Sequence, residues 1–265
     1  MKTLVLGAAL ALVLTAATLP AGARAQDHVP TVIAPQVETP TRVLLVGNSY
    51  LYYGDSLHNH LSRMVEADNP GIDLEWKSAT IGGARLADHD IDRLTTPGAI
   101  GVDEPFQLVL LQGHSAAALS EANQERFRTA ATAAAEVIAA RGGKVALYMP
   151  QAYVAPHKRA DPENIRRNEA FYTDVGNELG ALVVPVALAF EEAYKRRPEI
   201  RLHKDFDGSH PSILGTYLAA ATAYATLYGT SPVGNAYDYF GTIAPEDAAF
   251  LQQVAQDVVT AYHGG

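Results

Sequence analysis

Short apolar runs alternate along this chain with longer stretches of helical character. A run of about four to eight apolar residues is typical of a strand that is covered on both faces of a parallel sheet. Runs of this kind predict strands at residues 42–46, 106–111, 144–149 and 181–186, with a further strand candidate at 72–79. Helix-forming patterns, some opened by Pro or closed by Gly, predict helices at residues 51–67, 121–140, 162–179, 212–228 and 245–262.

Strands that alternate with helices of this length imply right-handed crossovers between parallel strands. The sequence therefore predicts one α/β domain over residues 42–265, built as three layers (α/β/α) around a parallel sheet of about five strands, as in flavodoxin-like folds. In open sheets of this type the functional site lies at the carboxyl ends of the strands.

The N-terminal segment has the pattern of a signal peptide rather than of a folded element. Lys2 gives a positive charge, residues 4–19 are apolar, and Ala23-Arg24-Ala25 is a small-x-small cleavage sequence. We therefore expect residues 1–25 to be removed after Ala25, which predicts a secreted or periplasmic protein. Residues 26–41 contain three prolines and little periodicity, and they predict an exposed leader.

Composition excludes several classes of function. The formal net charge is −9, and it becomes −11 without residues 1–25, because these contain Lys2 and Arg24 but no acidic residue. An acidic surface argues against nucleic acid and against stable association with an anionic membrane after signal cleavage. The chain contains no cysteine, so disulfides, thiol catalysis and thiolate metal ligands are excluded. The oligomeric state is left open.

Four polar loops follow predicted strands or precede a helix. They are residues 47–50, 81–84, 112–115 and 207–210. Asp207 and His210 lie three residues apart, directly before Pro211 and a long helical pattern. An acid at this spacing can orient the histidine ring while the other ring nitrogen faces a nucleophile. Two serines at strand ends are candidate nucleophiles, Ser49 after the first strand and Ser115 after the third.

Three of these segments resemble the sequence blocks of the SGNH (GDSL-type) hydrolases. Val46-Gly-Asn-Ser-Tyr50 resembles the first block, with Asn48 in place of the usual Asp. Gly82-Gly83 stands where the second-block glycine would be. Asp207-Gly-Ser-His-Pro211 resembles the last block. The resemblance implies an SGNH-type fold without a cofactor or metal. It also implies Ser49 as nucleophile, His210 as base and Asp207 as the group that orients the base.

The same resemblance suggests an oxyanion hole and a substrate pocket. Its donors would be the backbone N–H groups of Ser49 and of Gly82 or Gly83. The third block of the family usually supplies an Asn, which is absent here; the sequence reads Gln112-Gly113-His114-Ser115, similar to a Gln-Gly-Glu-like sequence in carbohydrate acetylesterases of the superfamily. We therefore expect Gln112, or else His114, to donate a side-chain hydrogen bond. Asn48, Tyr50 and His114 are predicted to contact substrate.

Three alternatives remain at this stage. Gly113-His-Ser-Ala-Ala117 resembles the nucleophile elbow of the α/β-hydrolases, which would make Ser115 the nucleophile. A metal-dependent hydrolase could use His89 and the neighbouring acids. A non-catalytic glycan-binding relative of the SGNH fold is the third. The favoured hypothesis is a secreted serine esterase that hydrolyses a small-molecule or glycan ester, such as an acetylated carbohydrate or a short acyl ester, through an acyl-enzyme.

Overall fold

The fold, a computed structural model, is described for residues 28–264, so the predicted signal peptide lies outside the described residues. It contains a parallel five-stranded sheet in the order β2-β1-β3-β4-β5. The strands are β1 (Arg42–Gly47), β2 (Glu75–Thr80), β3 (Leu108–Gln112), β4 (Lys144–Tyr148) and β5 (Leu182–Val184). Within residues 28–264 no helix is both long enough and apolar enough to cross a membrane.

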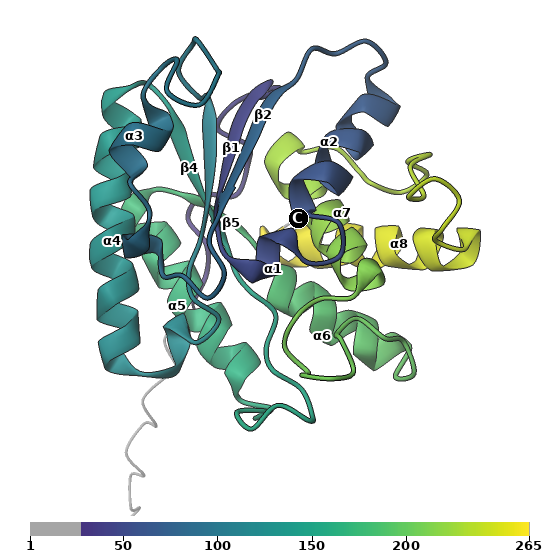
Figure 1. The fold of residues 1–265 in the computed structure, drawn as a ribbon. Coiled ribbons are helices and arrows are strands. Elements are labelled where there is room, and N and C mark those ends of the chain that lie inside the picture. The colour runs from purple at the N-terminus through teal and green to yellow at the C-terminus, as the bar shows by residue number, and fades with distance from the viewer. Residues whose placement is uncertain (1–27, 265) are drawn as a thin grey trace, which may run out of the picture.

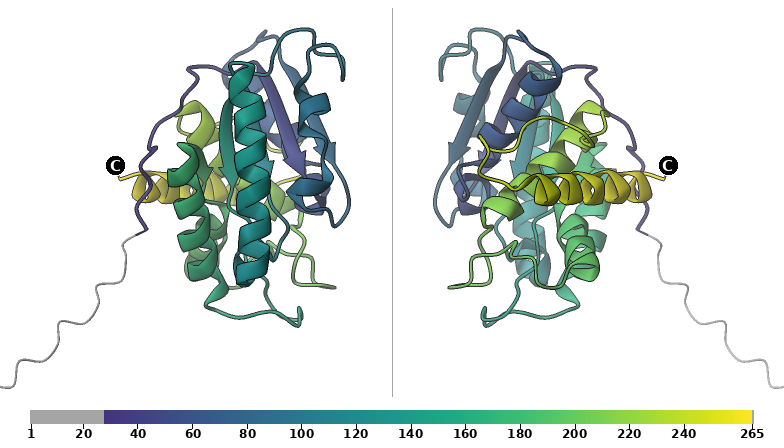
Figure 2. Two further views of the ribbon diagram at one scale, coloured as in Figure 1. Left: turned by 90° about the vertical axis from the view of Figure 1, so that its left-hand side faces the viewer. Right: turned by 90° about the vertical axis from the view of Figure 1, so that its right-hand side faces the viewer.

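Helices cover both faces of the sheet (Figures 1 and 2). On one face lie α3 (Ile91–Thr95), α4 (Glu121–Ala140) and α5 (Asn164–Leu179). The other face carries α2 (Leu57–Asp68), α6 (Val186–Arg196), α7 (Ile213–Tyr228) and α8 (Pro245–Tyr262). The predicted three-layer architecture and strand number are therefore confirmed.

The sheet separates two apolar cores. Along β1, Val43 and Leu45 point into the core beneath α7, whereas Leu44 and Val46 point into the core beneath α4. Successive side chains of a strand alternate between faces. Because both faces are covered, residues 43–46 of β1 are all apolar and buried, which explains this continuous apolar run in the sequence.

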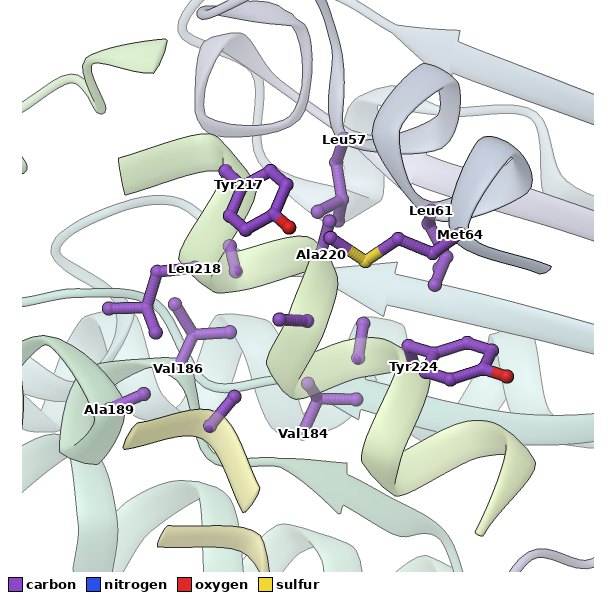
Figure 3. Packing of buried hydrophobic residues seen from close by; sticks show 14 of the residues in the cluster. Leu57, Leu61, Met64, Val184, Val186, Ala189, Tyr217, Leu218, Ala220 and Tyr224 are labelled. Carbon is purple, nitrogen blue, oxygen red and sulfur yellow. The ribbon is translucent and has the colours of Figure 1, made fainter. Parts of the chain in front are cut away.

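Helix α7 is buried along nearly its whole length, and its side chains pack among those of the surrounding elements (Figure 3). The predicted site residues Asp207 and His210 lie just before its start. Small residues such as Ala220 let α2 and α8 approach it closely. Two of its three tyrosine hydroxyls are satisfied by the domain around the helix: Tyr217 donates to Tyr237 O at 2.7 Å, and Tyr224 donates to Asp68 Oδ2 at 2.6 Å. Ser212 caps the helix, accepting from the Gly215 N–H at 3.1 Å, and thereby fixes the chain just after His210.

The predicted helix at 51–67 is wrong as a single element. It consists of α1 (Ser49–Tyr52) and α2, separated by Gly54, Asp55 and Ser56, which have φ values of 64°, 68° and 66°. Contact with α7 enforces the break: a Cβ on Gly54 would lie 2.3 Å from Thr216 Oγ1.

Two other segments differ from expectation. Helix α6 begins at Val186, where the sequence predicted the end of a strand. In the described part of the predicted leader, 28–41, many residues are exposed, yet the segment is held against the domain. His28 Nδ1 lies 2.7 Å from Asp174 Oδ1, and the Tyr228 hydroxyl donates to Pro40 O at 2.7 Å.

Candidate active site

Ser49 is placed by the end of β1. The strand ends at Gly47, Asn48 caps α1 by accepting from the Tyr50 N–H at 3.1 Å, and Ser49 is the first residue of that helix. Gly47 has no room for a side chain, because a Cβ there would lie 2.3 Å from Gln112 Oε1. Ser49 therefore stands at the carboxyl edge of the sheet, where sites of this fold are expected.

The structure brings Ser49, His210 and Asp207 into one hydrogen-bonded chain. Ser49 Oγ lies 2.8 Å from His210 Nε2, and His210 Nδ1 lies 2.5 Å from Asp207 Oδ2. With the ring proton on Nδ1 directed to the carboxylate, Nε2 is free to accept the serine proton. Such a chain can activate a hydroxyl as a nucleophile.

A tight turn holds the acid in place. Asp207 Oδ1 accepts from the backbone N–H groups of Ser209 at 2.9 Å and His210 at 3.1 Å. Burial of Asp207 opposes its ionisation, but the hydrogen bond from the His210 ring and these two N–H groups outweigh it, so the pKa of Asp207 lies below its usual value. Gly208 allows the turn through its φ of 60°, and its carbonyl accepts from the Val154 N–H at 2.8 Å.

Two tyrosines surround the His210 ring. Tyr53 stacks on it, with ring centroids 4.0 Å apart and an interplanar angle of 20°. Tyr50 meets the ring edge-on at 5.7 Å, and its hydroxyl lies 2.7 Å from Ser209 Oγ. Tyr50 is only 3% exposed, so the prediction that it contacts substrate is corrected: it supports the Asp207–His210 turn from inside. Sequence reasoning did not assign Tyr53 this contact, since only its closeness to Ser49 in the chain hinted at it.

The predicted backbone donors of an oxyanion hole remain candidates. Among residues 28–264, no hydrogen-bond acceptor is found for the backbone N–H groups of Ser49, Gly82 or Gly83. The loop that contains both glycines is attached to β1, because the Ile81 N–H donates to Gly47 O at 3.1 Å. Gly83 has a φ of 72°, and both glycines are exposed. These N–H groups can therefore meet a substrate carbonyl beside Ser49.

Gln112 does not fit the predicted role of side-chain donor. It is 1% exposed, and its amide nitrogen donates to Asn48 Oδ1 at 3.0 Å and to Gly113 O. Its Oε1 accepts from the Asn48 N–H at 2.9 Å. Gln112 and Asn48 bond to each other because the register of β1 and β3 places the ends of these two strands side by side. Both amide hydrogens are thus used within the protein.

Asn48 is likewise structural rather than substrate-binding. It is 2% exposed, and its Nδ2 donates to Ala84 O at 3.0 Å. His114 is half-buried and retains a donor: its Nδ1 accepts from the Ala116 N–H at 3.1 Å, which leaves the proton on Nε2. Burial is the largest cause that lowers the pKa of His114, and the nearby Arg85 and Arg159 guanidinium groups lower it further. The ring is therefore neutral near pH 7.

The two rival sites lack the partners that their chemistry needs. Ser115 Oγ accepts from the Tyr153 hydroxyl at 2.7 Å, whereas the base His210 contacts Ser49. His89 is half-buried, and the described chain contains no group of three or more His, Asp or Glu side chains arranged to hold a metal ion.

No protein-family model and no curated protein matches the sequence. Solved structures do match. A DUF4886 family protein from Bacteroides uniformis has a TM-score of 0.61 at 17% identity, covering 82% of this chain and 93% of that one. A putative SGNH hydrolase from Slackia heliotrinireducens has a TM-score of 0.54 at 22% identity, covering 71% of this chain and 100% of that one.

The acetylxylan esterase Axe2 from Geobacillus stearothermophilus is also similar. Its TM-score is 0.55 at 14% identity, with 76% of this chain and 98% of that chain covered. Solved structures of an SGNH hydrolase and of an acetylxylan esterase thus match this chain over most of its length. The chain has the fold of the SGNH hydrolases.

Proposed function

We propose that this protein is a secreted serine esterase that hydrolyses a carboxylic ester through an acyl-enzyme. The observation that carries the proposal is the chain of hydrogen bonds from Ser49 through His210 to Asp207 at the carboxyl edge of the sheet. Carboxylic ester hydrolases among the structural neighbours support it at the level of the reaction class.

In the acylation step, Ser49 Oγ attacks the ester carbonyl carbon as its proton moves to His210 Nε2. The carbonyl oxygen becomes an oxyanion, which the backbone N–H groups of Ser49 and of Gly82 or Gly83 would stabilise. Asp207 holds the ring and stabilises the imidazolium. When the tetrahedral intermediate collapses, the C–O bond to the alcohol breaks, and His210 returns the proton to the departing oxygen.

In the deacylation step, water repeats the chemistry in reverse. His210 takes a proton from the water as its oxygen attacks the acyl carbon of the Ser49 ester. Collapse of the second intermediate returns the proton to Ser49 Oγ and releases a carboxylic acid. All the proton transfers pass through the Nε2 atom that faces Ser49.

The identity of the ester is a finer proposal. Two neighbours are acetylxylan esterases, which supports an acetylated carbohydrate or a short acyl ester as substrate. The likeness of Gln112-Gly113 to acetylesterase sequences lends no further support, because the Gln112 amide bonds to Asn48 and Gly113.

Paired serine variants test the nucleophile. Ser49→Ala and Ser115→Ala would each be assayed for kcat on p-nitrophenyl acetate. Loss of the nucleophile should lower kcat by about 10³-fold or more, so we expect that loss for Ser49→Ala and near-normal turnover for Ser115→Ala. The reverse pattern would contradict the proposal. If the wild type hydrolyses no ester yet binds glycans saturably, the non-catalytic relative is the better description.

Export is tested separately. The proposal predicts that cells of the source organism, or a bacterial host, release a mature chain beginning at Gln26. N-terminal sequencing or intact mass of the extracellular or periplasmic protein would show it, and a full-length chain retained in the cytoplasm would contradict it.

A further inference from the structure

An apolar groove lies outside the serine–histidine–aspartate chain. It has a volume of about 560 Å³ and runs between the segment that follows β2 and the surface of α4. Leu86 and Ile91 line one wall, and Phe127, Ala130 and Val137 line the other. These two elements are in direct contact on the α4 face of the sheet (Figure 1).

One end of the groove meets the neighbourhood of Ser49. Its lining residues Arg85 and His114 directly follow Ala84 and Gly113 in the chain. The carbonyl oxygens of Ala84 and Gly113 lie 3.0 Å and 3.5 Å from the side-chain nitrogen of Asn48, the residue before Ser49. One end of the groove therefore lies close to Asn48, the residue before the proposed nucleophile.

The direction of the groove distinguishes the two halves of an ester. The alcohol oxygen must lie near His210 Nε2 to receive its proton. His210 precedes α7, which covers the opposite face of the sheet from α4. The acyl chain is the remaining substituent of the tetrahedral carbon and points away from His210, which is the side on which Arg85, His114 and the groove lie.

The dimensions of the groove suit an extended carbon chain. Its lining on α4 reaches from Asn123 to Val137, and at ~1.5 Å per residue this is roughly 21 Å. An extended chain advances roughly 1.2 Å per bond, as a polypeptide backbone does, so a chain of about seventeen bonds spans this length. Small side chains such as Ala130 and Ala133 leave this space open, while the charged groups of Arg85 and Arg126 stand at its border with solvent.

We propose that this groove binds the acyl chain of the ester and that the enzyme accepts linear acyl groups of about eight to sixteen carbons, not only acetyl. The inference rests on the proposed esterase function and extends its substrate range. Each methylene buried in the groove should raise kcat/KM about two- to fourfold until the groove is filled.

Two exposed alanines on α4 provide a matched test. Ala133 lines the groove, whereas Ala139, further along the same helix, does not. The ratio of kcat/KM for p-nitrophenyl dodecanoate to that for p-nitrophenyl acetate would be measured for the wild type, A139F and A133F. We expect a ratio well above one for the wild type and A139F, and a ratio at least about tenfold lower for A133F. A87F, which fills the opposite wall at another exposed position, should behave like A133F, and thermal melts verify folding.

A ratio of one or less in the wild type would overturn the proposal, as would equal ratios for A139F and A133F. A direct binding measurement separates this failure from failure of the esterase function. Dodecanoate would be titrated calorimetrically into Ser49→Ala and into the same variant carrying A133F. Binding that A133F weakens about tenfold supports the groove even if no ester is hydrolysed, and absence of binding overturns it even if p-nitrophenyl acetate is hydrolysed.

Discussion

Gly208 lies between the proposed acid and base, and Gly208→Ala tests whether its turn positions them. A Cβ at this residue would lie 2.1 Å from Val154 O and 2.9 Å from Ala155 O. Carbon and oxygen atoms do not approach so closely without a shift, and both obstacles are backbone atoms. The turn must therefore move by about 1 Å, against the hydrogen bond from the Val154 N–H to Gly208 O.

Two costs add in this variant. The left-handed conformation, with a φ of 60°, costs an alanine ~1 kcal/mol more than a glycine. Relief of the steric overlap costs about 1–3 kcal/mol, as overpacking of a filled site does. The free energy of unfolding should fall by about 2–4 kcal/mol, which lowers Tm by roughly 5–15 °C for a domain of this size.

Activity should fall by more than stability explains. Displacement of Asp207 and His210 by ~1 Å lengthens the 2.8 Å contact between His210 Nε2 and Ser49 Oγ. A misplacement of ~1 Å costs on the order of 10²-fold in kcat. The assay is kcat on p-nitrophenyl acetate at a temperature where circular dichroism shows the variant folded.

Gly142→Ala is the matched control. Gly142 has a φ of 81°, but no heavy atom lies within 4 Å of the position that a Cβ would take, and the residue follows α4 at the opposite end of the sheet from Ser49. The variant should lose only ~1 kcal/mol and keep its kcat. The reasoning fails if Gly208→Ala has normal kcat, or if both variants lose the same stability.

Two further changes probe contacts of the site, and a third probes His203, which is buried beside Tyr194. Asp207→Asn should lower kcat on p-nitrophenyl acetate by about 10⁴-fold, because an amide favours the wrong tautomer of His210; a loss under tenfold would contradict the orienting role. Tyr53→Leu removes the ring stacked on His210 and should lower kcat about tenfold, whereas Tyr52→Leu, whose ring stacks on Tyr53, should have a smaller effect; equal effects would contradict this. Burial lowers the pKa of His203 to about 4, so unfolding takes up a proton and stability is lost as the pH falls from about 6.5 toward 4, by ~1.4 kcal/mol per pH unit. His203→Gln should reduce the slope of stability against pH in urea denaturation between pH 4 and 7, and an unchanged slope would contradict it.

The strands could be predicted because burial on both faces leaves a simple trace in the sequence. Val43 through Val46 are all fully buried, and the apolar run that records this needs no knowledge of partners. The bounds predicted for helix α8 are those observed, since Pro245 is a local start signal. Strand boundaries shifted by up to three residues, as for β2, which begins at Glu75 rather than at residue 72.

Elements that depend on distant contacts could not be predicted in the same way. The break after α1 exists because Gly54 meets Thr216 on α7, far along the chain. The start of α6 is hidden in the sequence because Val183, Val184 and Val186 form one apolar run that belongs partly to β5 and partly to the helix. Only Pro185 marks the boundary, and its effect on the preceding residue is compatible with a strand end.

In the site, too, contacts between residues close in sequence could be predicted, whereas contacts between distant residues could not. The three-residue spacing of Asp207 and His210 is a local property, and it predicts a contact that the structure contains at 2.5 Å. Which serine faces His210 depends on how the loops meet at the sheet edge, and residue types alone leave Ser49 and Ser115 open. The contact of 2.8 Å with Ser49 arises because the end of β1, an interior strand beside β3, meets the turn before α7.

Gln112 shows why a donor cannot be assigned from residue type. An oxyanion donor needs an N–H that the folded protein leaves unused, yet burial favours side chains whose polar groups are satisfied. Asn48 and Gln112 satisfy each other across the ends of β1 and β3, so the pair holds the backbone on which the Ser49 N–H lies. The side chain expected to touch the oxyanion instead positions a backbone group that can. The candidate donors that the fold leaves unused at this edge are the backbone N–H groups of Ser49, Gly82 and Gly83, together with His114 Nε2.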